Sequence, residues 1–249
     1  MQPKNDAHCL VDSVSCELSA GEILGIIGPN GAGKSSLLKA LVGDWAYQGR
    51  LDIIGISADP VLRARQMAVL PQFSLLNFPY RAEEVVSLGR IPHKSGSKRD
   101  AEIIDQALKM MDIGFLKDRL YTQLSGGEKQ RVQLARVFAQ IWDQNDAENG
   151  LRLLILDEPT TALDLGHQQA LMSAIQAFAR KGVAVVMVLH DVNLAARYVD
   201  KVLALLCSQV VAYGSPEDVI TQDNIQRLYE VDIEILKHPK DNTPIVVGI

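Results

Sequence analysis

The feature that most constrains the fold is a glycine-rich turn between a predicted strand and a predicted helix. Residues 22–27 form an apolar run of strand length, residues 28–35 match the pattern G-x-x-x-x-G-K-[ST], and apolar residues then recur at helical spacing from Lys34 to Val42. Glycines let successive backbone N–H groups point at phosphate oxygens, and a helix N-terminus adds partial positive charge. The pattern therefore predicts a site for a nucleoside triphosphate, in which Lys34 reaches the β- and γ-phosphates and the Ser35 hydroxyl is a ligand of Mg²⁺. The expected nucleotide-binding residues of this turn are Gly28, Pro29, Asn30, Gly31, Ala32, Gly33, Lys34, Ser35 and Ser36.

A second pattern supplies the carboxylates that such a site needs. Residues 153–156 are the apolar residues of a predicted buried strand, and Asp157 and Glu158 follow at its carboxyl end. In open α/β sheets, ligands bind at that end of the strands. We expect Asp157 to hold Mg²⁺, directly or through water, and Glu158 to act as general base toward an attacking water. One of the two acids could instead be a solvated turn residue, but not both.

The order of the predicted strands indicates an α/β core. Residues 151–156 and 183–189 are continuous apolar runs, which is typical of parallel strands covered on both faces. Shorter strands are expected at residues 50–54 and 67–70, and a helix is expected at residues 166–181. Strands that alternate with helices in this way predict a parallel sheet.

A helical segment interrupts this alternation between residues 81 and 142. One helix carries an apolar stripe, with Ser97 and Asp100 as a possible capping pair, and a second begins after Ser125, with Glu128 completing a capping box. The expected organisation is a single domain over residues 1–249, with a nucleotide-binding core (1–80 and 150–214), a helical subdomain (81–149) and a C-terminal tail of helix and strand (215–249).

Composition excludes several classes of protein. The chain has 30 acidic and 25 basic residues, a net charge of −5, which argues against a protein that coats nucleic acid. No apolar run approaches the ~18–20 residues that cross a bilayer, and the N-terminus has no apolar signal core, so a cytoplasmic protein is expected. The cysteines Cys9, Cys16 and Cys207 are scattered and odd in number, which favours buried, reduced thiols over disulfides.

Residues 124–131, with the sequence LSGGEKQR, resemble the signature sequence of ATP-binding cassette (ABC) ATPases. With the glycine-rich turn, the strand that ends at Glu158, and with Gln72, Asp164 and His190, the chain matches the full set of motifs of that family in the expected order. The resemblance covers essentially the whole chain. It implies a P-loop NTPase (RecA-like) core with an inserted helical subdomain, and hydrolysis of ATP with Mg²⁺.

The resemblance also implies how the signature sequence is used. In the family, two copies pair head to tail, and each ATP lies between the glycine-rich turn of one copy and Ser125, Gly126 and Gly127 of the other. Taken alone, Ser125 is the N-cap of a helix and could be purely structural. The two glycines favour a ligand, because glycine at a helix start costs stability and lets a ligand approach.

Three single residues complete the implied site. Gln72 resembles the glutamine that meets Mg²⁺ and the attacking water and couples the site to a membrane partner. His190 resembles the histidine that contacts the γ-phosphate and positions the water, and Asp164 resembles the acid that links the two sites across the dimer. By pattern alone, Gln72 would be a surface residue and His190 a core histidine at the end of a strand.

The sequence departs from the family pattern at the expected adenine platform. Family members usually carry an aromatic residue in the first strand that stacks on adenine, whereas this chain has no aromatic residue before Trp45. Either the true start lies upstream of Met1, or weaker apolar contacts hold the adenine. Loss of a stacking platform would cost on the order of 1–3 kcal/mol by analogy with aromatic–base stacking.

Several segments resemble the ATPase subunits of bacterial haem importers within this family. They are residues 76–80, 83–86, 89–93, 132–136 and 189–197. ATPases of iron-siderophore and cobalamin importers share much of this pattern. An exporter ATPase and a soluble ABC ATPase without a transport role are further alternatives.

The same resemblance implies the partners. These are a second copy of the chain, transmembrane permease subunits and, indirectly, a periplasmic substrate-binding protein, at the cytoplasmic face of the bacterial inner membrane and without nucleic acid. The permease is expected to dock on the helical subdomain near Gln72, where residues 73–80 are rich in apolar and aromatic side chains. Packing between the two lobes explains those side chains equally well.

Overall fold

Continuous apolar runs form neighbouring strands of a central sheet in the computed structural model. The structure describes residues 11–53, 55–72, 76–143 and 151–248. Strands β2 (Met67–Leu70), β3 (Arg152–Asp157) and β4 (Val183–Val188) pair in parallel, and every residue of β3 and β4 is buried. Both faces of these strands are covered, which is why their apolar residues do not alternate with polar ones. The predicted parallel sheet is confirmed.

The strand order of this sheet, within the described ranges, is β2-β3-β4-β1-β5-β6, with β1 (Ile23–Ile27) buried at every position. The chain divides into two compact units whose boundary passes through β1. The phosphate-loop unit lies within residues 1–17, 25–51 and 190–249, and the signature unit lies within residues 18–24 and 52–189. The core, helical subdomain and tail predicted from the sequence have other boundaries and stay a prediction.

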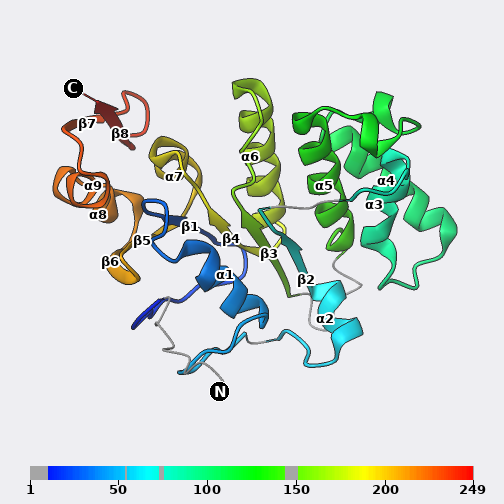
Figure 1. Ribbon diagram of the computed structural model, residues 1–249, viewed down its shortest axis with the longest axis horizontal. Coiled ribbons are helices and arrows are strands. Elements are labelled where there is room, and N and C mark those ends of the chain that lie inside the picture. Colours follow the sequence, from blue (N-terminus) through cyan, green and yellow to red (C-terminus); the bar gives the residue numbers. More distant parts are fainter. Residues whose placement is uncertain (1–10, 54, 73–75, 144–150, 249) are drawn as a thin grey trace, which may run out of the picture. The chain divides into compact units, whose positions relative to one another are not determined.

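Three helices of the signature unit follow β2 in the chain and precede β3, as predicted. Helices α3 (Ala82–Ser87), α4 (Ser97–Met110) and α5 (Gly126–Gln140) pack against one another (Figure 1). Of the expected apolar stripe of α4, Ile104 is half-buried and the other residues are buried. Helix α5 buries Val132, Ala135 and Phe138. Burial of such stripes, rather than helix propensity, supplies most of the stability of helices in proteins. The unit also contains α2 (Pro60–Gln66), α6 (Leu165–Ala179) and the 3₁₀ turns η1 (Leu88–Arg90), η2 (Gly114–Leu116) and η3 (Tyr121–Gln123).

Buried polar side chains hold the C-terminal end of α5. Arg90 Nη1 donates to the carbonyl oxygen of residue 139 at 2.8 Å, and Arg152 Nη1 donates to that of residue 141 at 2.8 Å. His93 Nε2 lies 2.7 Å from the carbonyl oxygen of residue 140. The last carbonyls of a helix have no partner within it, and cations interact favourably with the negative end of its dipole. The helix that begins with the signature sequence is therefore anchored at its far end.

The phosphate-loop unit contains the rest of β1 and the elements that follow β4. Its helix α1 (Lys34–Val42) has the predicted bounds. Strands β5 (Lys201–Leu206) and β6 (Gln209–Gly214) pair antiparallel, and the C-terminal segment forms helices and a hairpin, as expected for the tail. The remaining elements are α7 (Val192–Tyr198), α8 (Pro216–Val219), α9 (Gln222–Tyr229), β7 (Ile233–Lys237) and β8 (Pro244–Gly248).

The longest helices of the described ranges, α5 and α6, have 15 residues each. A membrane-spanning helix needs ~20 predominantly apolar residues. Within the part of the chain that the structure describes, no helix combines the length and the apolar character needed to cross a bilayer.

Two local predictions were wrong. Residues 50–53 are not a strand, because the Ile56 N–H donates to the Ile53 carbonyl at 3.2 Å and the chain turns there; Ile54 lies outside the described residues. Ser97 and Asp100 do not form a capping pair, since the N-cap of α4 is Gly96. Asp100 Oδ1 instead accepts hydrogen bonds from Arg90 Nε and Ser95 Oγ at 2.8 and 2.7 Å.

The cysteines are also less buried than predicted. Cys16 and Cys207 are free and exposed, and Cys9 lies outside the described residues. Cys207 lies in the tight turn between β5 and β6 with a φ of 48°. A turn at that position leaves a side chain little to pack against.

Candidate functional site

The phosphate loop, residues 28–36, connects β1 to α1. Gly28, Gly31 and Gly33 have φ values of 146°, 79° and 99°, a region that glycine reaches without steric cost. A Cβ atom on Gly28 would lie 2.1 Å from the Leu205 carbonyl oxygen, whereas one on Gly31 would meet nothing within 4 Å. Gly28 is thus required by close packing as well as by conformation, and Gly31 by conformation alone.

Lys34 closes the phosphate loop from within. Its side chain is buried, and Nζ donates to the carbonyl oxygens of Gly28 and Pro29 at 2.8 and 2.9 Å. Helix α1 begins at Lys34 with Gly33 as its N-cap, without a side-chain cap and without an acidic residue in its first turn. The positive end of this helix and the Lys34 ammonium group are therefore suited to an anion, and the first turn of α1 has no carboxylate that would compete for it.

The other predicted residues of the loop follow the same backbone path. Asn30 and Gly31 are exposed, Ser35 and Ser36 are half-buried in the first turn of α1, and the buried Ala32 accepts a hydrogen bond from the Ser208 N–H at 3.2 Å. The nine predicted residues therefore form the turn after β1 and the first helical turn of α1.

Tyr229, at the end of α9, contacts the same loop. The Gly28 N–H donates to the Tyr229 hydroxyl oxygen at 3.1 Å, and burial raises the pKa of that hydroxyl. The two residues are 201 positions apart in the sequence. No motif pointed to Tyr229, so sequence reasoning missed this contact.

The predicted acidic residues lie where β3 ends in the signature unit. Asp157, the last residue of β3, is buried, and Glu158 follows with a φ of 53°, in the left-handed region. Because β2 and β3 are parallel with Leu70 opposite Leu156, the exposed Gln72 follows β2 at the same sheet edge as these two acids. The structure thus brings the predicted Gln72, Asp157 and Glu158 to one edge.

The signature turn, residues 125–127, begins α5 as predicted. Ser125 Oγ accepts the Glu128 N–H at 3.3 Å, and Glu128 Oε2 accepts the Ser125 N–H at 2.7 Å, so the predicted capping box is confirmed. Hydrogen bonding of the Glu128 carboxylate to Ser125, chiefly to its backbone N–H and then to its side chain, lowers the pKa of Glu128. The helix start therefore already carries one negative charge of its own.

The acid turn, residues 158–164, lies next to the signature turn. A Cβ atom on Gly127 would lie 2.8 Å from the Ala162 carbonyl oxygen, and Gln130 Nε2 donates to the Pro159 carbonyl at 3.2 Å. Asp164 ends the turn as the N-cap of α6, where its Oδ1 accepts the His167 N–H at 2.9 Å.

His167 connects Asp164 to α5, and sequence reasoning did not single it out. Its Nδ1 lies 2.8 Å from Asp164 Oδ2, and its Nε2 lies 2.8 Å from Arg131 Nη1. The backbone and then the side-chain hydrogen bond from His167 lower the pKa of Asp164. A histidine three residues after an aspartate N-cap was a usable signal for the first contact, because such side chains are neighbours on a helix.

The predicted site residues divide between the two units. The phosphate loop and the exposed His190, which follows β4, belong to the phosphate-loop unit. Gln72, the signature turn and the acid turn with Asp157 belong to the signature unit. Residues 1–10, the N-terminal segment where an adenine platform was sought, lie outside the described residues.

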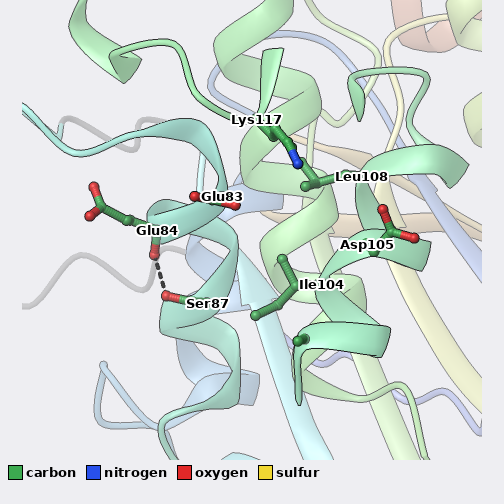
Figure 2. A pocket seen from close by; sticks show the side chains of 8 residues that line it. Glu83, Glu84, Ser87, Ile104, Asp105, Leu108 and Lys117 are labelled. Atoms are coloured by element: carbon green, nitrogen blue, oxygen red, sulfur yellow. Dashed lines mark hydrogen bonds between the residues drawn. The ribbon is translucent and has the colours of Figure 1, made fainter. Parts of the chain in front are cut away.

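A separate groove of about 380 Å³ lies between α3 and α4. Figure 2 shows Glu83 and Glu84 on α3, Ile104, Asp105 and Leu108 on α4, and Lys117 beside them. The groove has an apolar floor, three carboxylates and one ammonium group around it, and so a net negative rim. Two exposed aromatic side chains, Phe78 and Tyr80, precede α3, while residues 73–75 lie outside the described residues.

Comparison with known proteins gives consistent matches. Residues 11–161 match the model of the family described as ABC transporter. The chain is 47% identical over 248 residues to the hemin import ATP-binding protein HmuV of Pseudomonas entomophila (strain L48), covering 98% of this chain and 96% of that protein. It is 44% identical over 244 residues to the protein of the same name from Plesiomonas shigelloides, covering 93% of each.

A solved structure agrees with the fold. The ATP-binding fold of this chain resembles a structure described as an inward-facing conformation of a metal-chelate type ABC transporter, with a TM-score of 0.75 and 27% identity. The likeness covers 92% of this chain and 88% of that one. The likeness to the two relatives and to this structure thus extends over nearly the whole chain.

Proposed function

This chain belongs to the ABC transporter family as one of its ATP-binding, ATP-hydrolysing subunits, and from that premise we propose that it energises an importer of hemin. The observation that carries the proposal is the identity of 47% and 44%, over nearly the whole chain, to two proteins named for hemin import. The 27% identical metal-chelate type transporter supports the wider substrate class, since haem, ferric siderophores and cobalamin are all metal chelates.

The phosphate loop supports binding of the triphosphate of ATP. Glycine backbone N–H groups and the uncapped N-terminus of α1 are suited to phosphate oxygens, and Lys34 carries the positive charge that the β- and γ-phosphates require. Because Lys34 Nζ is held by two loop carbonyls, its charge is positioned before a ligand arrives. Such preorganisation reduces the entropy lost on binding.

The acid turn supports hydrolysis. We assign Glu158 as the general base that accepts a proton from water as the water oxygen attacks the γ-phosphorus and the bond to the leaving ADP oxygen breaks. Its positive φ is a conformation that costs free energy and is common at active sites. Gln72 and His190 would orient the water, with His190 also at the γ-phosphate.

Oxygen donors suited to Mg²⁺ are present among the predicted residues. They are the half-buried Ser35 hydroxyl, the exposed Gln72 amide and the buried Asp157 carboxylate. No cluster of three or more His, Cys, Asp or Glu side chains that could hold a metal occurs within the described ranges, which fits an ion held by a few side chains and substrate phosphates. When bound, Mg²⁺ neutralises charge that develops on the phosphates.

A second copy and a permease complete the proposed assembly. Ser125, Gly126 and Gly127 of one copy would contact ATP held by the phosphate loop of the other, and Asp164 would link the two sites. The groove with the acidic rim is the proposed permease contact, because cytoplasmic loops of membrane proteins carry an excess of Lys and Arg. A periplasmic binding protein would deliver the substrate, with this chain at the cytoplasmic face of the inner membrane.

The catalytic assignment is tested with Glu158→Gln and Lys34→Ala. Glu158→Gln removes the proton acceptor but keeps the shape, so we expect kcat to fall at least about a hundredfold while the Kd for ATP is unchanged. Lys34→Ala removes the charge on the phosphates, so nucleotide binding itself should be lost. Turnover at the wild-type rate in Glu158→Gln, measured by phosphate release, would show that another group is the base.

The substrate is tested with the chain reconstituted with its permease in vesicles. Hemin, cobalamin and a ferric siderophore are each offered with ATP inside, and uptake is measured beside that of the Glu158→Gln complex. We expect ATP-dependent uptake of hemin alone. Uptake of cobalamin or the siderophore instead would replace the substrate and leave the ATPase role intact.

A further inference from the structure

Arg131, His167 and Asp164 form a continuous chain of polar contacts within the signature unit. Arg131 Nη1 lies 2.8 Å from His167 Nε2, and His167 Nδ1 lies 2.8 Å from Asp164 Oδ2. Arg131 lies on α5, six residues after Ser125, and Asp164 and His167 lie at the start of α6. One imidazole ring therefore spans the space between two helices that begin at different motifs.

The chemistry of the three groups fixes the proton on this ring. A guanidinium group has donors only, so His167 Nε2 must accept from Arg131. The single proton of a neutral imidazole then lies on Nδ1, where it donates to the Asp164 carboxylate. Each ring nitrogen thus has a different partner, and both contacts are needed to connect α5 with Asp164.

Other contacts join the same two segments. The Gly127 Cα lies so close to the acid turn that an added Cβ would be 2.8 Å from the Ala162 oxygen, and Gln130 Nε2 donates to the Pro159 carbonyl at 3.2 Å. Arg131 Nη1 also donates at 3.0 Å to the carbonyl of Asp112, which lies just after α4 and outside these two segments. The first two turns of α5 therefore contact the acid turn directly at Pro159 and Ala162, and they reach Asp164 through His167.

We propose that His167 is a positioning residue that locks the signature turn and the acid turn into one body within a subunit. A displacement of α5 is transmitted through Arg131 and His167 to Asp164, and the acid turn that starts at Glu158 moves with it. This inference rests on the proposed function for the roles of Ser125–Gly127 and Glu158. It adds a coupling between the two ATP sites of the dimer. When the signature turn of a subunit contacts ATP in one site, the acid turn of the same subunit, which belongs to the other site, is held in position.

Two substitutions each remove one half of the connection. In His167→Asn the amide nitrogen takes about the place of Nδ1, so donation to Asp164 is kept and the contact with Arg131 is lost. In His167→Gln the longer side chain can accept from Arg131, and the donation to Asp164 is lost. A second Asp–His pair has the same spacing, with the half-buried His238 Nδ1 at 2.9 Å from Asp241 Oδ1, and gives the matched control His238→Asn.

We expect each His167 variant to keep the wild-type Kd for ATP and to lower kcat about tenfold, because a small misplacement of reacting groups is costly. His238→Asn should keep both constants. If His167 only supported the N-cap of α6, His167→Asn would keep the wild-type kcat, because it keeps the donation to Asp164. A wild-type kcat in either His167 variant therefore overturns the proposal.

Backbone hydrogen exchange tests the proposal independently of hydrolysis. In both His167 variants, amides of residues 126–131 and of residues 159–168 should exchange several-fold faster than in the wild type and in His238→Asn. Faster exchange confined to residues 164–168 would show a local cap and overturn the proposal. If the wild-type protein does not hydrolyse ATP, the proposed function fails, and the exchange result still decides whether the two turns move together.

Discussion

The phosphate loop and the signature turn both place glycines at the start of a helix, but different kinds of contact hold them. In the phosphate loop, Lys34 Nζ bonds to carbonyls five and six positions earlier. In the signature turn and the first turns of α5, Gln130 and Arg131 bond to groups 29 and 36 positions later in the chain. The Lys34 side chain thus closes the phosphate loop within one short segment, whereas the side chains of Gln130 and Arg131 connect the start of α5 to the acid turn and α6.

The two helix starts also differ in charge. Helix α1 has no side-chain cap and no acid in its first turn, so its N-terminal N–H groups remain available to an anion. Helix α5 has its own capping box, and Glu128 places a carboxylate at the same end. Because that carboxylate offsets part of the positive end of the dipole, α5 is the weaker anion site by itself. This difference fits a loop that binds ATP alone and a turn that completes a site formed by another copy.

The largest expected effect separates two glycines of the phosphate loop. Gly28→Ala combines a φ of 146° with a Cβ 2.1 Å from the Leu205 oxygen, so strain and overpacking should together cost about 3 kcal/mol or more. Gly31→Ala also requires an alanine at a φ of 79°, but its Cβ would meet nothing within 4 Å. It should lower the free energy of unfolding by about 1–2 kcal/mol. Urea unfolding of the nucleotide-free protein measures both, and equal losses would contradict the role given to β5.

A smaller effect should separate the two glycines of the signature turn. Gly127→Ala places a Cβ 2.8 Å from the Ala162 oxygen, and we expect a loss of about 1–2 kcal/mol from overpacking. Gly126→Ala meets nothing within 4 Å and gains helix propensity, so its free energy of unfolding should stay the same or rise by up to about 1 kcal/mol. If both variants were equally stable, the acid turn would not constrain the start of α5.

The smallest effect concerns the one long-range side-chain contact identified at the phosphate loop. Tyr229→Phe removes the hydroxyl that accepts the Gly28 N–H, and should lower the free energy of unfolding by about 1 kcal/mol. Tyr47→Phe, at an exposed tyrosine of the same unit, is the matched control and should change nothing. An unchanged unfolding midpoint in Tyr229→Phe would mean that this hydrogen bond does not stabilise the loop.

Sequence reasoning succeeded where a structure depends on neighbouring residues. The bounds of α1, the capping box of Ser125 and Glu128, and the buried strand that ends at Asp157 all follow from apolar spacing and from side chains within three residues. It failed at Asp100, where the same local logic predicted a cap but the carboxylate bonds to Arg90 and Ser95. A buried guanidinium needs an acceptor more than an exposed helix start needs a cap, because an unpaired buried charge is costly.

The sequence by itself indicated an ABC transporter fold and predicted a nucleotide site at residues 28–36, because the glycines, Lys34 and Ser35 of the phosphate loop lie within one short segment. Only the tertiary structure decided that β5 excludes a side chain at Gly28, that Tyr229 accepts its N–H, and that His167 joins Arg131 to Asp164. Each of these depends on residues brought together by the packing of strands and helices far apart in the chain. The spacing of a motif predicts the conformation and chemistry of one segment. A contact between two segments forms only when the folded core brings both of them together.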